Sequence, residues 1–214
     1  SVTFWFAFEL LNLRFQNWYY VGAFKGATRL DQALAGVFVV VCFATVFVGI
    51  FETIELLSAF DVWRRWKTGG AAAESRRYPA WVSWAVQGLG AAMASVAIVF
   101  PHWLAPLIWG SLTFLVDPWN YRRGARSLLR DLERGDYGLV ARVFVAGLIC
   151  GLVWESLNFF APQKWIYTVR GLEGLKLFEM PLLGFLGFPA LALDSVAAYG
   201  LVAYWVLGNE TWEH

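Results

Sequence analysis

The chain has 214 residues, of which 59% are apolar, 18% aromatic and 15% charged, and its formal net charge is +1. A soluble domain carries roughly a quarter charged residues, so the composition argues against a water-soluble domain. The near-neutral charge argues against a nucleic-acid partner. The chain starts at Ser1 with no basic stretch before an apolar one, unlike a signal peptide, and we expect its beginning to be missing.

Long apolar runs predict an all-α, polytopic membrane helix bundle. A helix that crosses a bilayer needs about 20 mostly apolar residues. The first ten residues resemble the end of such a helix, and a shorter apolar run covers 103–117. We therefore expect about six transmembrane segments, the first incomplete. The four long runs lie near 33–57, 80–100, 139–160 and 182–207.

Lysine and arginine residues predict the orientation. The loops 61–79 and 118–138, together with Arg142, carry eleven of them, whereas the loops 12–32 and 161–181 carry six. Basic loops tend to stay on the cytoplasmic side. We therefore expect the first two loops to be cytoplasmic and the second two periplasmic, in a bacterial inner membrane.

Two stretches have nearly the same order of polar groups. They are "FELLNLRFQNWYY" (8–20) and "WESLNFFAPQKWIY" (154–167). The matching pairs, at offsets close to 147 residues, are Glu9 with Glu155, Asn12 with Asn158, Gln16 with Gln163, Trp18 with Trp165, Tyr20 with Tyr167, Asp31 with Glu179 and Gly36 with Gly184. They predict two tandem repeats, an N-terminally truncated one in 1–100 and a second in 101–214. Four membrane crossings separate the two motifs, so the halves are expected to be parallel and related by an axis along the membrane normal.

The stretch "WESLNFFAPQKWIYTV", followed by "FEMPLLGFLGFP", resembles a family of uncharacterised bacterial multi-pass membrane proteins with the motifs WExxN…KWxY and FExPxxGFxGFP. The resemblance covers mainly residues 103–200. It implies a bacterial integral membrane protein and no particular activity.

The run 139–160 carries polar and small residues on one face. Gly147, Gly151, Glu155 and Asn158 fall within about 80° of arc on a helix, and the GxxxG pair allows another helix to approach closely. Glu155 and Asn158 are therefore expected to face protein.

Two interpretations of this polar face stay open. It is either a site for a cation, a lipid headgroup or a polar cofactor edge, or a polar corner. In a corner, Glu155 accepts bonds from indole or backbone N–H groups, while the asparagine and glutamine side chains hold the turn. The candidate residues in both copies are Glu9, Asn12, Gln16, Trp18, Glu155, Asn158, Gln163, Trp165 and Tyr167.

Further acids lie in or beside the apolar runs. Asp194 is expected near mid-membrane, where a charge is costly, either in an ion or proton role or bonded to a neighbouring helix. Glu52 and Glu55 lie near the expected cytoplasmic end of their segment, where pairing with Arg64 or Arg65 would account for both. Asp117 is expected in a turn at a helix end.

The sequence lacks the motifs of common metal, haem, nucleotide and catalytic sites. Two histidines are too few for a bis-histidine haem or a typical metal centre, and no phosphate loop, nucleophile elbow, zinc spacing or dinucleotide fingerprint is found. We therefore expect no catalytic residue, no metal and no cofactor.

Three functions remain as hypotheses. The preferred one is a non-catalytic accessory or scaffold subunit of a larger bacterial membrane complex, for example an energy-transducing or photosynthetic one. Its partners would be membrane lipids, other membrane-protein subunits and a carotenoid or other pigment at the lipid-facing surface. The alternatives are a membrane enzyme acting on a lipid or isoprenoid through Glu155 and Asn158, and a transporter or proton pathway using Asp194.

Overall fold

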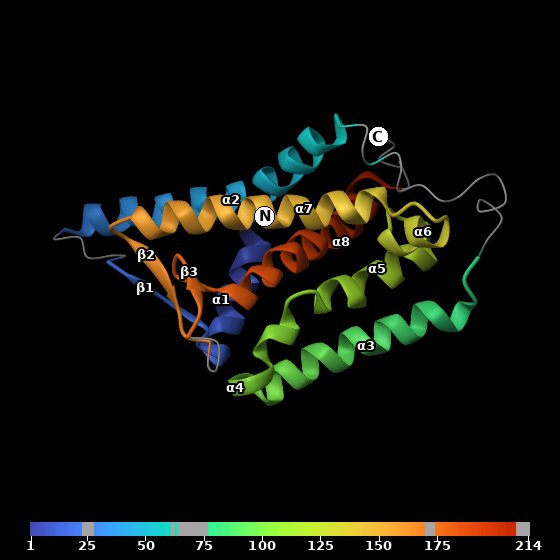
Figure 1. The fold of residues 1–214 in the computed structure, drawn as a ribbon, viewed down its shortest axis with the longest axis horizontal. Helices are drawn as coiled ribbons and strands as arrows, with labels where there is room; N and C mark the ends of the chain where they lie inside the picture. The colour runs from blue at the N-terminus through green and yellow to red at the C-terminus, as the bar shows by residue number, and fades with distance from the viewer. Residues whose placement is uncertain (23–27, 61–62, 64–76, 170–173, 209–214) are drawn as a thin grey trace.

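The computed structural model describes residues 1–22, 28–60, 63, 77–169 and 174–208, and most of these residues are helical (Figure 1). The helices are α1 (Val2–Phe15), α2 (Arg29–Ser58), α3 (Ala80–Val99), α4 (Pro101–Leu104), α5 (Ser111–Arg123), α6 (Leu128–Glu133), α7 (Gly138–Phe160) and α8 (Gly187–Leu207), with 3-10 turns η2 (Ala105–Ile108) and η3 (Leu182–Leu186). The short strands are β1 (Trp18–Val21), β2 (Lys164–Tyr167), β3 (Lys176–Leu177) and β4 (Met180–Pro181).

Four segments of the described chain are long and apolar enough to cross a membrane. They are Arg29–Ser58, Ala80–Val99, Gly138–Phe160 and Leu182–Leu207. Each coincides with one of the four long apolar runs identified in the sequence. An apolar run in a membrane is expected to be helical, because a helix satisfies its own backbone hydrogen bonds. The expected helical, membrane-compatible class is thus confirmed, whereas the count of six segments is not.

The run 103–117 is not a single helix, in contrast to the prediction. It is divided among α4, η2 and α5, with Gly110 in the left-handed region (φ 84°) just before α5. Helix α5 continues to Arg123, and α6 follows, so the stretch 118–138 is more structured than the expected loop. Asp117 lies inside α5 and not at a helix end, so that prediction was wrong.

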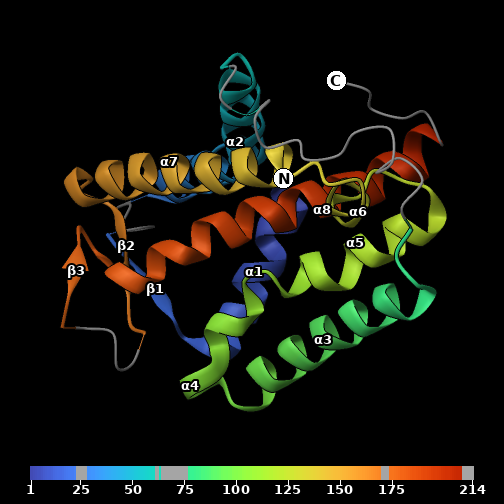
Figure 2. The same cartoon turned by 45° about the vertical axis from the view of Figure 1, so that its right-hand side comes forward.

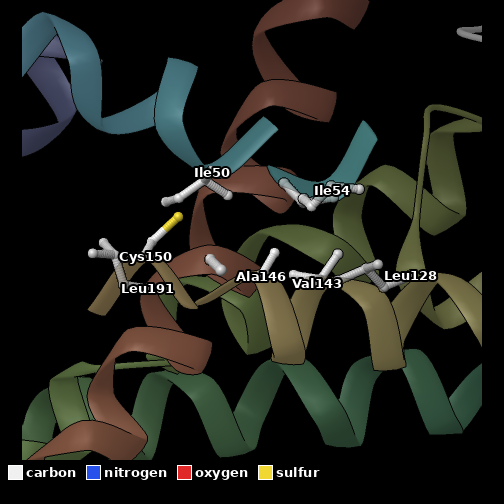
Figure 3. Packing of buried hydrophobic residues seen from close by; sticks show 9 residues of the cluster. Ile50, Ile54, Leu128, Val143, Ala146, Cys150 and Leu191 are labelled. Carbon is white, nitrogen blue, oxygen red and sulfur yellow. The ribbon is translucent and has the colours of Figure 1, made fainter. Parts of the chain in front are cut away.

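The main apolar core lies where α7 packs between α2 and α8. Ile50 and Ile54 of α2 point toward Val143, Ala146 and Cys150 of α7 (Figure 3). Leu128 and Leu191, together with Ala192 and Val196, complete the cluster from α6 and α8.

The predicted close approach at the two glycines of α7 is confirmed. A Cβ atom on Gly147 would lie 2.6 Å from the Phe188 carbonyl oxygen, and one on Gly151 would lie 2.3 Å from the Phe188 ring. Only glycine lets α8 lie against α7 at this distance. The same face of α7 carries Glu155 one turn further on.

The connecting segments gather at the two ends of the helices. Strands β1, β2 and β3 lie at one end, whereas α6 and the N-terminus of α3 lie at the other (Figure 1). Helix α2 rises above α7 in Figure 2, and Ile50 and Ile54 hold its C-terminal half against α7. Strands β1 and β2 form an antiparallel ribbon, and β3 and β4 form a second, shorter one, neither of which was expected from an all-α prediction.

Candidate functional site

The first candidate group lies where α7 meets the β1–β2 ribbon, and we call it the Glu155 corner. The Glu155 residue is fully buried, at 0% exposure. Its Oε1 atom accepts hydrogen bonds from the Trp165 indole N–H at 3.1 Å and from the Tyr167 hydroxyl at 2.8 Å. The Trp165 indole also donates to the Tyr167 hydroxyl oxygen at 2.9 Å. The expected hydrogen bonds to Glu155 from its own motif are therefore present.

Asn158 holds the turn that follows α7. Its Nδ2 donates to the Trp165 carbonyl at 2.9 Å, and its Oδ1 accepts from the Trp165 backbone N–H at 2.9 Å. Both ends of the amide are thereby used by a single residue of β2. The expected role of Asn158 in fixing the turn is confirmed, and its amide has little capacity left for a ligand.

The Glu9 corner, at the end of α1, uses the same chemistry. Glu9 Oε1 accepts from the Trp5 indole N–H at 3.0 Å and from the Tyr20 hydroxyl at 2.5 Å. Asn12 donates to the Trp18 carbonyl at 2.8 Å and accepts from the Trp18 N–H at 3.3 Å. The indole donor comes from Trp5, which the sequence comparison did not single out, and not from Trp18.

The two glutamines contribute differently from the prediction. Gln16 lies in the left-handed region (φ 54°) at the end of α1, and its carbonyl accepts a hydrogen bond from the Thr168 hydroxyl. Gln163 is exposed. Neither glutamine side chain forms a hydrogen bond within the described parts of the chain. The turn is therefore held by main-chain geometry and by asparagine.

The β1–β2 ribbon joins the two corners. Its register pairs Trp18 with Tyr167 and Tyr20 with Trp165. Residues opposite each other and residues two apart share one face of a ribbon, so these four aromatic side chains project on the same side. In both of these cross-strand pairs, a tryptophan of one repeat motif lies opposite the tyrosine of the other motif, so the pairing is symmetric between the two motifs. The two corners are therefore locally equivalent, whereas the repeat of the complete halves stays a prediction.

The aligned acids Asp31 and Glu179 play different roles. Asp31 completes a capping box with Thr28 at the start of α2. Glu179 precedes β4 and forms an ion pair with Lys164 at 2.8 Å. This difference restricts the observed equivalence to the corners and the ribbon.

Both tyrosines of the corners remain neutral over a wide pH range. Burial raises the pKa of Tyr20 above its usual value, and the nearby Glu9 carboxylate raises it further. Burial likewise raises the pKa of Tyr167 well above its usual value, with added contributions from Glu155 and Tyr20. Neutral phenols can donate hydrogen bonds to both glutamates.

Asp194 connects α8 to the N-terminus of α5. Its Oδ2 accepts from the Gly110 N–H at 2.9 Å, and its Oδ1 accepts from the Thr113 N–H and hydroxyl, each at 2.6 Å. The residue is fully buried. Unpaired N–H groups at a helix start favour a carboxylate, so Asp194 acts as a cap supplied by another helix.

Asp117 does the same for α6 and was missed by sequence reasoning. Its carboxylate accepts from the Leu128 and Leu129 N–H groups, both at 2.7 Å, and from the Ser127 hydroxyl at 3.0 Å. Ser127 at the start of an apolar turn was the only local signal of a helix N-terminus there.

Glu52 and Glu55 are exposed on α2. Neither carboxylate forms an ion pair or a hydrogen bond with the part of the chain that the structure describes. The expected partners, Arg64 and Arg65, lie outside the described residues.

An open pocket of about 820 Å³ lies beside the ribbon, between the end of α1 and the α4–η2 turn. It is lined by Asn12, Leu13, Phe15, Gln16, Asn17, Trp18, Tyr19, Pro101, His102, Trp103, Pro106, Thr168 and Val169. Glu155 does not line it. Within the described residues, no group of three or more His, Cys, Asp and Glu side chains is placed to hold a metal ion.

The fold is that of a helical protein whose four long apolar segments are compatible with insertion in a membrane. Comparison with models of protein families, with curated proteins and with solved structures finds no match to this chain.

Proposed function

We propose that this chain is a non-catalytic accessory or scaffold subunit of a larger complex in the bacterial inner membrane. The observation that carries the proposal is the outer face of α2. Only 6% of the apolar window of α2 is buried within the chain, against 39% for that of α7. A long helix with so little internal packing is available to a second membrane protein.

The position of Glu52 makes lipid an unsuitable neighbour for this face. The Thr53 hydroxyl contacts the Cys150 sulfur at 3.4 Å, and Cys150 also donates to the Gly49 carbonyl. Cys150 lies near the middle of α7, so Glu52, which precedes Thr53, lies at a similar depth and deeper than the sequence predicted. A carboxylate exposed to hydrocarbon costs several kcal/mol. A partner helix with a lysine, an arginine or another hydrogen-bond donor at this depth removes that cost.

The other polar groups at membrane depth support architecture over chemistry. Asn158 uses both ends of its amide on the backbone of Trp165, and both oxygens of Asp194 cap α5. An ion carried by Asp194 would have to compete with three protein donors. These contacts favour a scaffold over the transporter and over catalysis by Asn158.

The finer architecture belongs to the same proposal. Six transmembrane segments form two parallel repeats, in 1–100 and 101–214, with the loops 61–79 and 118–138 in the cytoplasm and the loops 12–32 and 161–181 in the periplasm. The local equivalence of the Glu9 and Glu155 corners supports this arrangement. Lipids, with a carotenoid or other pigment in a photosynthetic or energy-transducing complex, would cover the remaining apolar surface.

Site-specific photo-crosslinking in intact bacterial membranes tests the proposal. A photoreactive residue at Val48, one turn before Glu52 and 57% exposed, should form an adduct with a defined membrane protein. The matched control is Leu89 on α3, which is 51% exposed and should form none.

Glu52→Gln should weaken the Val48 adduct, and Glu52→Lys should abolish it by placing a like charge against the donor of the partner. Lipid adducts alone at both positions, or a protein adduct that is unchanged in Glu52→Lys, would contradict the proposal.

A further inference from the structure

The Glu155 carboxyl group has one oxygen that the corner does not use. Its Oε2 atom is buried and has no hydrogen-bond partner among the described residues. The Oε1 atom, in contrast, accepts two hydrogen bonds, from Trp165 and Tyr167. In an ionised carboxylate, both oxygens carry negative charge and both need donors when water is excluded.

Among the residues that the structure describes, no cation pairs with this carboxyl group. Gly151, on the same face of α7, lies against the Phe188 ring, and the neighbouring cluster of Met180, Phe185 and Phe188 is apolar. Lys164 of β2 is paired at 2.8 Å with Glu179, which precedes β4. Glu179 therefore adds a negative charge nearby while its partner lysine is already engaged.

The Glu9 corner provides an internal comparison. Its carboxyl group accepts from an indole and a phenol, as that of Glu155 does. Glu9 is only partly buried, however, and Tyr20 beside it is 42% exposed. Water can therefore solvate a negative charge in the Glu9 corner and not in the Glu155 corner.

We propose that Glu155 is a proton-binding site, with the proton held on Oε2 and the carboxyl group neutral at physiological pH. The step is an acid–base equilibrium in which Glu155 takes a proton from solvent and no other group changes its charge. Protonation removes the buried charge and leaves Oε1 free to accept from Trp165 and Tyr167. A buried carboxyl group without a cation or a second donor favours its neutral form.

The two corners hold a phenol each, Tyr167 and Tyr20, on the same face of the ribbon. Tyr167 donates to Glu155 at 2.8 Å, and Tyr20, on the same ribbon face, donates to Glu9 at 2.5 Å. The raised pKa values of both tyrosines keep them in the donor form. Each corner therefore presents a neutral phenol to its own carboxyl group, on the same face of the ribbon.

Infrared spectroscopy of the purified full chain tests the proposal, because a protonated carboxyl group has a C=O stretching band that a carboxylate lacks. Protein labelled with ¹³C at the glutamate side-chain carboxyl separates glutamate from the buried Asp194 and Asp117. At neutral pH we expect a label-sensitive band that is lost in Glu155→Gln and retained in the matched variant Glu9→Gln. A spectrum without a label-sensitive band, or with one unchanged in folded Glu155→Gln, would overturn the proposal.

A second variant keeps Glu155 in place in case Glu155→Gln does not fold. Tyr167→Phe removes one hydrogen bond to Oε1, so the C=O band of a protonated Glu155 should move to higher frequency. Tyr20→Phe, the matched variant in the other corner, should leave the band in place. A band that responds to neither variant belongs to another glutamate and contradicts the assignment to Glu155.

Discussion

Replacing Asp194 by alanine is expected to weaken the fold strongly, because α5 would lose its cap. The change leaves the buried N–H groups of Gly110 and Thr113 without acceptors. Each unpaired buried group costs about 1–3 kcal/mol, so the two together cost about 2–6 kcal/mol. Total stabilities of folded domains are about 5–15 kcal/mol, which makes this a large fraction. Asp194→Asn keeps one acceptor oxygen and should lose roughly half as much.

Reversible unfolding in mixed detergent micelles, followed by circular dichroism, measures this loss. The matched control is Ser195→Ala, since Ser195 is also fully buried but, within the described chain, its side chain donates to the Leu191 carbonyl of its own helix alone. Its loss should cost about 1 kcal/mol or less. If Asp194→Ala unfolds within 1 kcal/mol of the parent chain, the carboxylate is not a structural cap and the transporter hypothesis regains support.

Three other predictions follow from the contacts described above. Asn158→Ala should lower stability in the same unfolding assay by about 1–3 kcal/mol, because the backbone of β2 loses both a donor and an acceptor. Gly151→Ala should destabilise the chain or shift α8, because its Cβ would lie 2.3 Å from a ring atom, whereas Gly88→Ala, with no atom within 4 Å, should not. Stability should fall as pH rises above about 10, the usual tyrosine pKa, because Tyr20 and Tyr167 ionise in the unfolded chain and stay protonated in the folded one. Tyrosinate absorbance that rises fully before unfolding would contradict this reasoning.

The sequence predicted those parts of the molecule that depend on local pattern. The four long apolar runs became α2, α3, α7 and the η3–α8 segment, and the Gly147/Gly151 face became the contact with α8. The corner around Asn158 was also predictable, because its partners lie within a few residues.

Features that depend on distant partners were missed. The run 103–117 is apolar throughout, yet Gly110 breaks it, and the helix that follows is capped by Asp194 from α8. Periodicity carries no information about such a contact. For the same reason Asp117, beside a proline, was assigned to a turn although it lies within α5. The β1–β2 pairing also required knowledge of which chain ends meet in space.

The β1–β2 ribbon imposes an order on biosynthesis. Strand β1 ends at Val21, but its only described pairing partner, β2, ends at Tyr167. At about 5–20 residues per second, roughly 7–30 s of translation separates the two strands. During that interval the edge of β1 has no strand to pair with, and unpaired edges are prone to join other chains. The ribbon therefore forms only after α7 has been synthesised. A membrane insertase or chaperone that shields β1 and the Glu9 corner would have to remain bound until then.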